Sequence, residues 1–213
     1  TAVTLASGAE HHWLTWYALD PGCEGIAYLR KRLEDLRPLA PKVVALSTTF
    51  VMTGPWLHAL CALIRKHYPG AKLIVGGYYY ATNTKQFLSL DADVLCVGEG
   101  DLSFPEVVKR LVEPRPLEDI PGLYVRAQDG TLRHTGHAGS LTLGTLPPVQ
   151  WRLAEKIDPF VDLSRDAIEF GVETQRGCIF KCEFCSYRTL VDPQVLTPEQ
   201  AVEGILATGI SPH

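Results

Sequence analysis

The sequence predicts an α/β protein in which a doubly wound parallel sheet is followed by the start of a second domain of strands and helices. Two observations carry this prediction. Short apolar runs alternate with segments of helical period over the first half of the chain, with about thirty residues in each strand-helix pair. A loop with three cysteines then follows a later run of strand character. Strands joined by crossover helices lie parallel, so the first half is expected to form one sheet.

The first half of the chain supplies the alternating elements. Helical segments have apolar residues at three- and four-residue steps and are expected at residues 24–36, 55–68, 83–90 and 102–112. Buried parallel strands are expected at residues 42–46, 72–75 and 93–97, where short apolar runs contain valine. Pro38, Pro41 and the pair Pro69-Gly70 end the first two helices. We therefore assign residues 1–113 to the sheet domain.

Each predicted strand ends in small or hydroxyl residues. They are Ser47, Thr48 and Thr49 after the first strand, Gly76 and Gly77 after the second, and Gly98, Glu99 and Gly100 after the third. Ligands of parallel α/β sheets bind outside the carboxyl ends of the strands, and glycine lets a ligand approach the main chain closely. A single turn of this kind is ordinary strand-to-helix chemistry, but three in succession favour a ligand-binding edge.

Residues 114–150 are interpreted as a linker that carries a small antiparallel ribbon. The strands of the ribbon are expected at residues 123–126 and 131–134, joined around Asp129-Gly130, which is a hairpin signal. The remaining residues, 151–213, are assigned to the second domain. A helix capped by a threonine and opened by a proline is expected near the end of that domain, running to about residue 207.

Two histidines in the linker form a candidate metal-binding pair. His134 and His137 lie three positions apart. A glycine stands between them and no acidic partner is near, so we interpret both as solvated loop residues.

Three cysteines within eight residues mark the candidate site of the second domain. Cys178, Cys182 and Cys185 follow a strand expected at residues 167–174. Thiolates are soft ligands for iron, and this spacing lets one loop hold three corners of an iron–sulfur cluster. Ferredoxin clusters normally have four cysteine ligands, so three leave one iron open to another ligand. A zinc site is the alternative, but it requires a fourth Cys or His, and the histidine downstream is His213 at the chain end.

The cysteine loop resembles the signature of radical S-adenosylmethionine (radical SAM) enzymes, in which an aromatic residue precedes the third cysteine. Phe184 is that aromatic residue here. The resemblance implies that the three cysteines hold a 4Fe-4S cluster, that the open iron chelates S-adenosylmethionine, and that Phe184 packs near the adenine. It also implies that reduction of the cluster by a donor such as a flavodoxin or ferredoxin splits the cofactor into methionine and a 5′-deoxyadenosyl radical.

The resemblance extends upstream of the cysteines. Ser-Thr-Thr at residues 47–49, Gly-Gly at 76–77, Gly-Glu-Gly-Asp at 98–101 and Ile-Pro-Gly-Leu-Tyr at 120–124 occur in the order seen in cobalamin-binding radical SAM enzymes, the class B methyltransferases. This similarity implies a Rossmann-like domain that holds cobalamin at its strand ends. Phe50 and Tyr78 are implied packing partners. The second domain would be the first unit of a partial (β/α) barrel.

One motif of many cobalamin proteins is absent. Residues 20–25 keep an aspartate and a glycine but lack the histidine of the Asp-x-His-x-x-Gly motif, as many members of this branch do. We therefore expect no protein histidine below cobalt. Removing that donor should ease passage to four-coordinate cobalt(I), which would take the methyl group of S-adenosylmethionine.

These motifs predict a cobalamin-dependent radical SAM methyltransferase that moves a methyl group from S-adenosylmethionine, via methylcobalamin, to a carbon of a small-molecule or peptide substrate. The branch also contains cyclases and ring-contracting enzymes. One alternative is a radical SAM methylthiotransferase, whose second cluster would use Cys23, Cys61 and Cys96. Another is a cobalamin-binding module without catalysis. The motifs assign no catalytic acid, base or substrate anchor.

The composition of the chain narrows the kinds of partner and the cellular location that are expected. The chain has 213 residues, 46% hydrophobic and 21% charged, with a net charge of −4 and a pI near 6.0, which gives no electrostatic reason to expect a nucleic acid or membrane partner. Six cysteines without a secretory signal favour a reducing, cytoplasmic location. Because the chain begins with Thr1, we expect a longer parent protein and little turnover from these residues alone.

Overall fold

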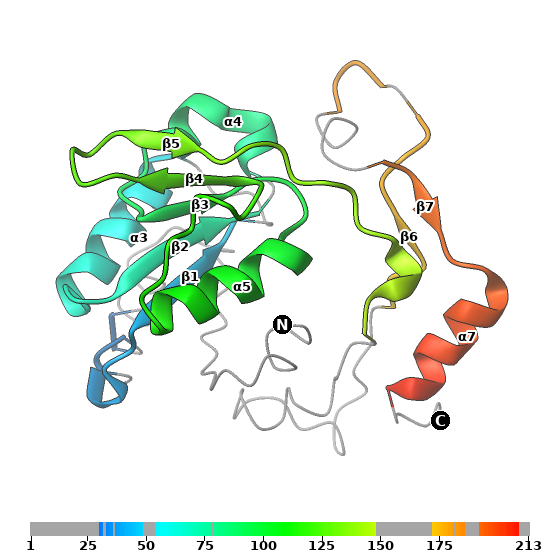
Figure 1. The fold of residues 1–213 in the computed structure, drawn as a ribbon, viewed down its shortest axis with the longest axis horizontal. Helices are drawn as coiled ribbons and strands as arrows, with labels where there is room; N and C mark the ends of the chain where they lie inside the picture. The colour runs from blue at the N-terminus through cyan, green and yellow to red at the C-terminus, as the bar shows by residue number, and fades with distance from the viewer. Residues whose placement is uncertain are drawn as a thin grey trace. The chain divides into compact units, whose positions relative to one another are not determined.

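The computed structural model of this chain divides it into two compact units. It describes residues 30–31, 33–35, 37–48, 54–77, 79–147, 172–180, 182–185 and 192–208. The first unit, Trp16–Gly139, is called the sheet unit here. The second, Thr1–Thr15 with Ser140–His213, is called the thiol unit. Each is described by itself (Figure 1).

A five-stranded sheet of order β1-β2-β3-β4-β5 forms the centre of the sheet unit. Strands β1 (Val43–Ser47), β2 (Lys72–Gly76) and β3 (Val94–Cys96) are parallel. Their bounds lie within a residue or two of those predicted, so the parallel sheet is confirmed. Their short apolar runs explain this agreement, because strands covered by helices on both faces need apolar residues at successive positions.

Helices α3 (Gly54–His67), α4 (Tyr79–Leu88) and α5 (Gly100–Val112) connect these strands. Residues 30–31 and 33–35 are also helical, and the short 3-10 helix η1 (Arg37–Leu39) follows them. Helix α4 starts earlier than its predicted start at residue 83. Asn83 has non-helical angles, φ −144° and ψ 51°, and interrupts the helix. The predicted start therefore coincides with a break inside the helix.

The ribbon of β4 (Leu123–Arg126) and β5 (Leu132–His134) forms at the predicted hairpin. It is not separate from the sheet, because β4 pairs antiparallel with β3, with Leu95 opposite Tyr124. The guanidinium of Arg126 donates hydrogen bonds of 2.9 Å to the carbonyls of Leu90 and Ala92, in the segment that leads into β3. The ribbon thus extends the parallel sheet by two antiparallel strands.

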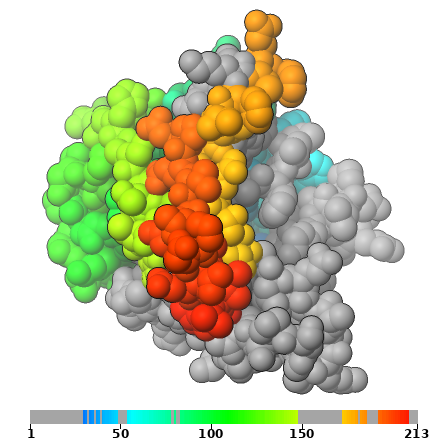
Figure 2. Space-filling view, turned by 90° about the vertical axis from the view of Figure 1, so that its right-hand side faces the viewer, coloured from blue at the N-terminus to red at the C-terminus, as the bar shows by residue number. Residues whose placement is uncertain are grey.

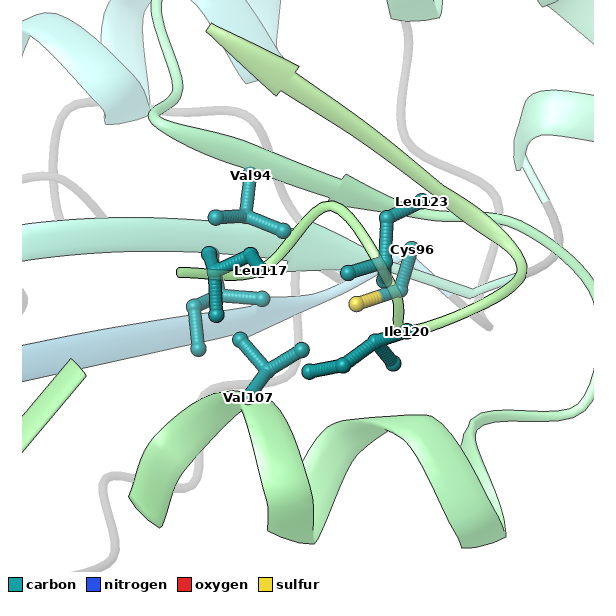
Figure 3. Close-up of a cluster of buried hydrophobic side chains, with 7 residues drawn as sticks. Val94, Cys96, Val107, Leu117, Ile120 and Leu123 are labelled. Atoms are coloured by element: carbon teal, nitrogen blue, oxygen red, sulfur yellow. The ribbon is translucent and has the colours of Figure 1, made fainter. Parts of the chain in front are cut away.

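Alternate residues of the strands face two separate cores. One core lies between the sheet and α5 and contains Ile74, Val94, Cys96, Val107, Leu117, Ile120 and Leu123 (Figure 3). The residues between them in the strands, such as Leu73, Val75 and Leu95, are also buried and face the other side, where Figure 1 shows α3 and α4. The structure therefore has helices on both faces of the sheet, as the sequence predicts.

The described part of the thiol unit holds a 3-10 helix, a two-stranded sheet and one helix. These are η2 (Leu143–Thr145), β6 (Gln175–Arg176) with β7 (Gln194–Val195), and α7 (Pro198–Ala207). Thr197 and Gln200 form a capping box at the start of α7, so the predicted helix start is confirmed.

The strand predicted at residues 167–174 differs from what the structure describes. Residues 172–174 are not in a strand, and residues 167–171 lie outside the described part. The strand before the cysteines is the two-residue β6, which pairs antiparallel with β7. The described residues thus do not show the start of a (β/α) barrel. No helix among them is long and apolar enough to cross a membrane.

Candidate functional site

The carboxyl ends of the three parallel strands lie at one edge of the sheet. Ser47 of β1 stands in register with Gly76 of β2. Leu95 of β3 pairs with Val75 of β2, and β3 ends at the next residue, Cys96. Gly77 and Gly98 follow these ends with φ angles of 106° and 87°, in the left-handed region that favours glycine. The structure therefore brings together the glycine turns that the sequence predicts to be a ligand edge.

Thr48 joins two of the strand ends. Its N–H and its hydroxyl both donate to the carbonyl of Gly76, at 2.8 and 2.9 Å, and the residue is 2% exposed. Ser47 is exposed at the same end. Thr49, Phe50 and Tyr78, the other predicted cofactor contacts at this edge, lie outside the described residues.

An alanine that sequence reasoning missed packs over the end of β3. A Cβ placed on Gly98 would lie 3.7 Å from the Cβ of Ala138, an ordinary contact distance. A Cβ on Gly122, whose φ is 80°, would lie 2.8 Å from the same atom and 3.0 Å from the carbonyl oxygen of Val97. The segment that leaves β5 therefore runs close against the strand end, held by a 2.9 Å hydrogen bond from the N–H of Gly122 to Gly136.

Two carboxylates stand where α5 begins at this edge. Glu99 is the N-cap residue, in extended conformation, and Asp101 lies in the first turn. A helix N-terminus attracts negative charge through its unpaired N–H groups. Because two acidic side chains already supply that charge, this end of the edge suits a ligand with hydroxyl or amide donors better than a bare phosphate.

A series of aromatic rings lies beside the end of β3. The ring centroids of Tyr80 and Tyr124 are 6.3 Å apart, those of Tyr124 and His134 are 4.6 Å apart, and those of His134 and His137 are 5.3 Å apart. Burial, and then a hydrogen bond with Tyr124, raises the pKa of Tyr80. Both histidines are exposed, as predicted, but His134 lies in β5 and packs on neighbouring rings rather than in a solvated loop.

The three cysteines of the thiol loop (residues 178–185) are accessible. Cys178 and Cys185 are half-buried and Cys182 is exposed. The N–H of Cys185 donates to the carbonyl of Cys182 at 3.1 Å, which closes a turn between these two residues. Ile179, Phe180 and Phe184 are 73%, 65% and 93% exposed. Figure 2 shows the loop, coloured amber, at the surface that faces the viewer.

The donor set of the thiol loop fits a thiophilic metal group. All three cysteines are free of disulfides, and three thiols in one short loop match the chemistry of iron–sulfur ligation. Within the described residues, no three Cys, His, Asp or Glu side chains are gathered into a formed metal site. Cluster ligation by these cysteines therefore stays a prediction, supported by donor type and accessibility.

The cysteines of the sheet unit have the opposite character. Burial, and then repulsion from Asp91, raises the pKa of Cys61 to about 11, and burial raises that of Cys96 to about 12. Cys61 lies in α3, whereas Cys96 points into the core on the α5 side of the sheet. The sheet separates the two thiols, so they do not converge on one cluster. Cys23 lies outside the described residues.

The chain is similar in sequence to two methyltransferases. No family model matches the chain. The chain is 27% identical over 153 residues to TokK, a cobalamin-dependent radical SAM methyltransferase of Streptomyces tokunonensis, covering 69% of this chain and 22% of TokK. It is 33% identical over 96 residues to an uncharacterized methyltransferase of Pyrococcus horikoshii, covering 44% of this chain and 20% of that protein.

Two solved structures share the fold. OxsB, a cobalamin-dependent S-adenosylmethionine radical enzyme solved with aqua-cobalamin bound, matches with a TM-score of 0.61 and 23% identity, over 85% of this chain and 25% of OxsB. TsrM from Kitasatospora setae, a radical S-adenosylmethionine methyltransferase solved with cobalamin and a 4Fe-4S cluster bound, matches with a TM-score of 0.55 and 16% identity, over 83% of this chain and 37% of TsrM.

These comparisons confirm the resemblance that the sequence motifs predict, since TokK, OxsB and TsrM are all cobalamin-binding radical SAM enzymes by description. The chain spans about a fifth of the length of the curated relatives it matches. The similarity therefore concerns a part of those proteins.

Proposed function

We propose that this chain is the cobalamin- and cluster-binding part of a radical SAM methyltransferase. The observation that carries the proposal is the pairing of two features in one chain, a glycine-lined parallel sheet edge followed by an accessible loop of three free thiols. Neither feature is specific alone. The similarity to TokK, which spans 153 residues, supports taking the two features together.

The sheet edge would hold cobalamin mainly through main-chain groups. Gly77 and Gly98, next to Gly76 and Gly100, are exposed beyond the strand ends, so a large flat ligand could approach the main chain there. Ser47 and Glu99 add a hydroxyl and a carboxylate at the same edge. The corrin carries many amide side chains, whose N–H groups suit the carboxylates at the start of α5.

The thiol loop would hold the cluster through Cys178, Cys182 and Cys185. When bound, the cluster, cobalamin and S-adenosylmethionine supply the radical and methyl-transfer chemistry. The protein residues would bind, orient and exclude water. Ile179, Phe180 and Phe184 leave large apolar surfaces exposed beside the thiols, and a bound cofactor or substrate would cover them.

Anaerobic reconstitution of this chain with iron, sulfide and hydroxocobalamin tests the proposal. We expect about four irons and one cobalamin per chain, measured by iron analysis and the ultraviolet-visible spectrum. About eight irons without cobalamin would favour the methylthiotransferase alternative. Cobalamin without iron would favour the non-catalytic binding module. If the chain binds neither iron nor cobalamin, the proposal is refuted.

The state of cobalt can be read in the same sample. Residues 20–25, where the cobalt-binding histidine of other cobalamin proteins is missing, lie outside the described residues. We propose that cobalt has no protein histidine below it. Electron paramagnetic resonance (EPR) of the cobalt(II) form should then show no coupling to a histidine nitrogen, and such coupling would contradict this part of the proposal.

Catalysis would require the longer protein. We propose that a longer protein containing this chain methylates a carbon of a small-molecule or peptide substrate and receives electrons from a flavodoxin or ferredoxin. Transfer of an isotope-labelled methyl group from S-adenosylmethionine to the substrate tests this. Methylation by the 213-residue chain alone would show that further segments are not needed.

A further inference from the structure

A short segment of the thiol unit contacts both the linker and the thiol loop. Residues 192–194, called the bracket here, lie between Cys185 and α7 in sequence. On one side they bind residues 140–143, the start of the thiol unit after the sheet unit ends. On the other side they pack against the residue that precedes the first cysteine. Both sets of contacts lie within the thiol unit.

The side chain of Gln194 makes the contact with the linker. The N–H of Leu143 donates to its Oε1 at 2.6 Å, and its Nε2 donates to the carbonyl of Leu141. Leu141 and Leu143 are both buried, where a backbone group without a partner is costly. The hydroxyl of Ser140 adds a 2.9 Å hydrogen bond to Oδ2 of Asp192. One planar amide therefore satisfies two buried backbone groups.

The other side of the bracket packs on Gly177. This residue is buried, with a φ of 75°. A Cβ there would lie 2.5 Å from the carbonyl oxygen of Asp192 and 2.9 Å from the Cα of Pro193. The pairing of β6 with β7 places Arg176 opposite Gln194. The main chain immediately before Cys178 is thus held against the bracket without an intervening side chain.

We infer that Gln194 is a positioning residue for the thiol loop. Its amide joins β7 to the linker and thereby fixes the bracket. Gly177 packs on the bracket, and this contact fixes the position of the main chain at Cys178. The inference rests on the proposed function, because the loop matters through the cluster it would hold. Its physical basis is preorganisation: a ligand whose supporting hydrogen bonds are lost binds its metal more weakly, typically by about 10–100-fold.

The test compares Gln194→Leu with Gln194→Glu and with Gln175→Leu as the matched control. Leucine keeps the size of the side chain and loses both hydrogen bonds. Glutamate keeps the acceptor for Leu143 and loses the donor for Leu141. Gln175 is an exposed glutamine on β6, opposite Val195. After anaerobic reconstitution, the rate at which a chelator removes iron is followed by the loss of cluster absorbance, and the EPR spectrum of the reduced cluster is recorded.

We expect Gln194→Leu to release iron about tenfold faster than the unmodified chain, with a shifted EPR spectrum, and Gln194→Glu to lie between them. Gln175→Leu should match the unmodified chain. Unchanged iron release and an unchanged spectrum in Gln194→Leu would overturn the inference. If Gln194→Leu does not fold by circular dichroism, the milder Gln194→Glu decides by the same two measurements.

Hydrogen exchange separates this inference from the proposed function. If the unmodified chain binds no iron, the proposed function fails, while amide exchange in the metal-free chain still reports on the bracket. We expect Gln194→Leu to speed exchange at Leu143 and at Cys178 together. Faster exchange at Leu143 alone would overturn the positioning role.

Discussion

The sheet unit and the thiol unit use the same residue type in opposite ways. In the sheet unit, Cys61 and Cys96 fill cores on opposite faces of the sheet, and burial raises their pKa values to about 11 and 12. In the thiol unit, the three cysteines lie at the surface beside exposed aromatic and aliphatic side chains. The wide spacing of Cys61 and Cys96 thus does not reveal whether a metal could reach them, whereas their burial shows that they are inaccessible.

The two units also differ in how they would contact a ligand. At the sheet edge, the hydroxyl of Thr48 donates to the main chain, and Gly77 and Gly98 are exposed. In the thiol loop the donors are side chains, and their support comes from packing under Gly177. The sheet edge is therefore built by the fold itself, while the loop is supported by the few contacts around Gly177.

The largest expected difference between the units is in metal binding. Replacing Cys178, Cys182 and Cys185 together with alanine should abolish iron binding and leave the thermal unfolding of the sheet unit unchanged, because these side chains are outside its core. Replacing Cys61 and Cys96 with alanine should retain iron and lower stability, since it empties buried volume. Iron analysis and thermal unfolding measure both. Loss of iron in the variant that lacks Cys61 and Cys96 would show that the buried cysteines take part in iron binding.

Thiol reactivity should differ almost as strongly. In the native, metal-free chain at pH 8, iodoacetamide should label the three loop cysteines at least about a hundredfold faster than Cys61 or Cys96, because only the thiolate reacts and burial both raises the pKa and blocks access. Mass spectrometry of digested peptides over time gives the rates. Comparable labelling of Cys96 in the folded chain would contradict its burial.

Phenylalanine provides the next contrast. Phe87 is fully buried and Phe184 is 93% exposed. Phe87→Ala should lower the free energy of unfolding by about 3–5 kcal/mol, whereas Phe184→Ala should change it by less than about 0.5 kcal/mol. Urea titrations followed by circular dichroism measure both. A stability loss for Phe184→Ala of the size expected for Phe87→Ala would show that the loop aromatic is packed.

Two glycines with equal backbone angles test the contact made by Ala138. Gly122 and Gly130 have φ angles of 80° and 82°, but only a Cβ at Gly122 would strike a neighbour. Gly130→Ala should cost about 1–2 kcal/mol, from left-handed backbone strain alone. Gly122→Ala should cost about 1–3 kcal/mol more, because Ala138 and Val97 would have to move. Equal costs in urea titrations would show that the Ala138 segment gives way freely.

Asp93 should give the sheet unit a pH-dependent contribution. Burial raises the pKa of Asp93, but hydrogen bonds from the N–H of Leu73, from Lys72 and from Arg65 outweigh it and hold the pKa below its ordinary range. The contribution is therefore present above about pH 4, the unfolded value, and is lost as the pH falls through the folded pKa. Asp93→Asn should cost about 1–3 kcal/mol at pH 7. The urea midpoint of the thiol unit should not respond.

The difference in the free energy of unfolding between the unmodified chain and Asp93→Asn should shrink as the pH falls below about 4. Urea titrations of both proteins between pH 2 and pH 7 provide the measurement. A difference that stays constant over this range would mean that the charge of Asp93 contributes nothing and that only its shape matters.

The strands and helices of the sheet unit follow from local pattern, because their apolar residues face cores on both sides. Three features do not follow from it. The pairing of Leu95 with Tyr124 joins ribbon to sheet through residues distant in sequence. Ala138 and Gln194 act through single long-range contacts that leave no periodic signal. Gly177 did carry a usable signal, since it directly precedes the first cysteine of the motif.

The cysteine loop shows a second limit of sequence patterns, because its motif predicts the ligands but not the strand before them. Its motif predicts donor type and spacing, but the described part of the strand expected at residues 167–174 is not in a strand, and Gln175–Arg176 forms a strand instead. A two-residue strand is stabilised by its partner β7 rather than by its own apolar pattern, so periodicity could not place it.

The most direct test of the account is EPR of the reduced, reconstituted chain with and without S-adenosylmethionine. A cluster held by Cys178, Cys182 and Cys185 has one iron without a protein thiolate, so adding S-adenosylmethionine should change the spectrum. A spectrum that stays the same, or a zinc ion held by these sulfurs after purification, would contradict the central claim that this loop holds a cluster open to a small ligand.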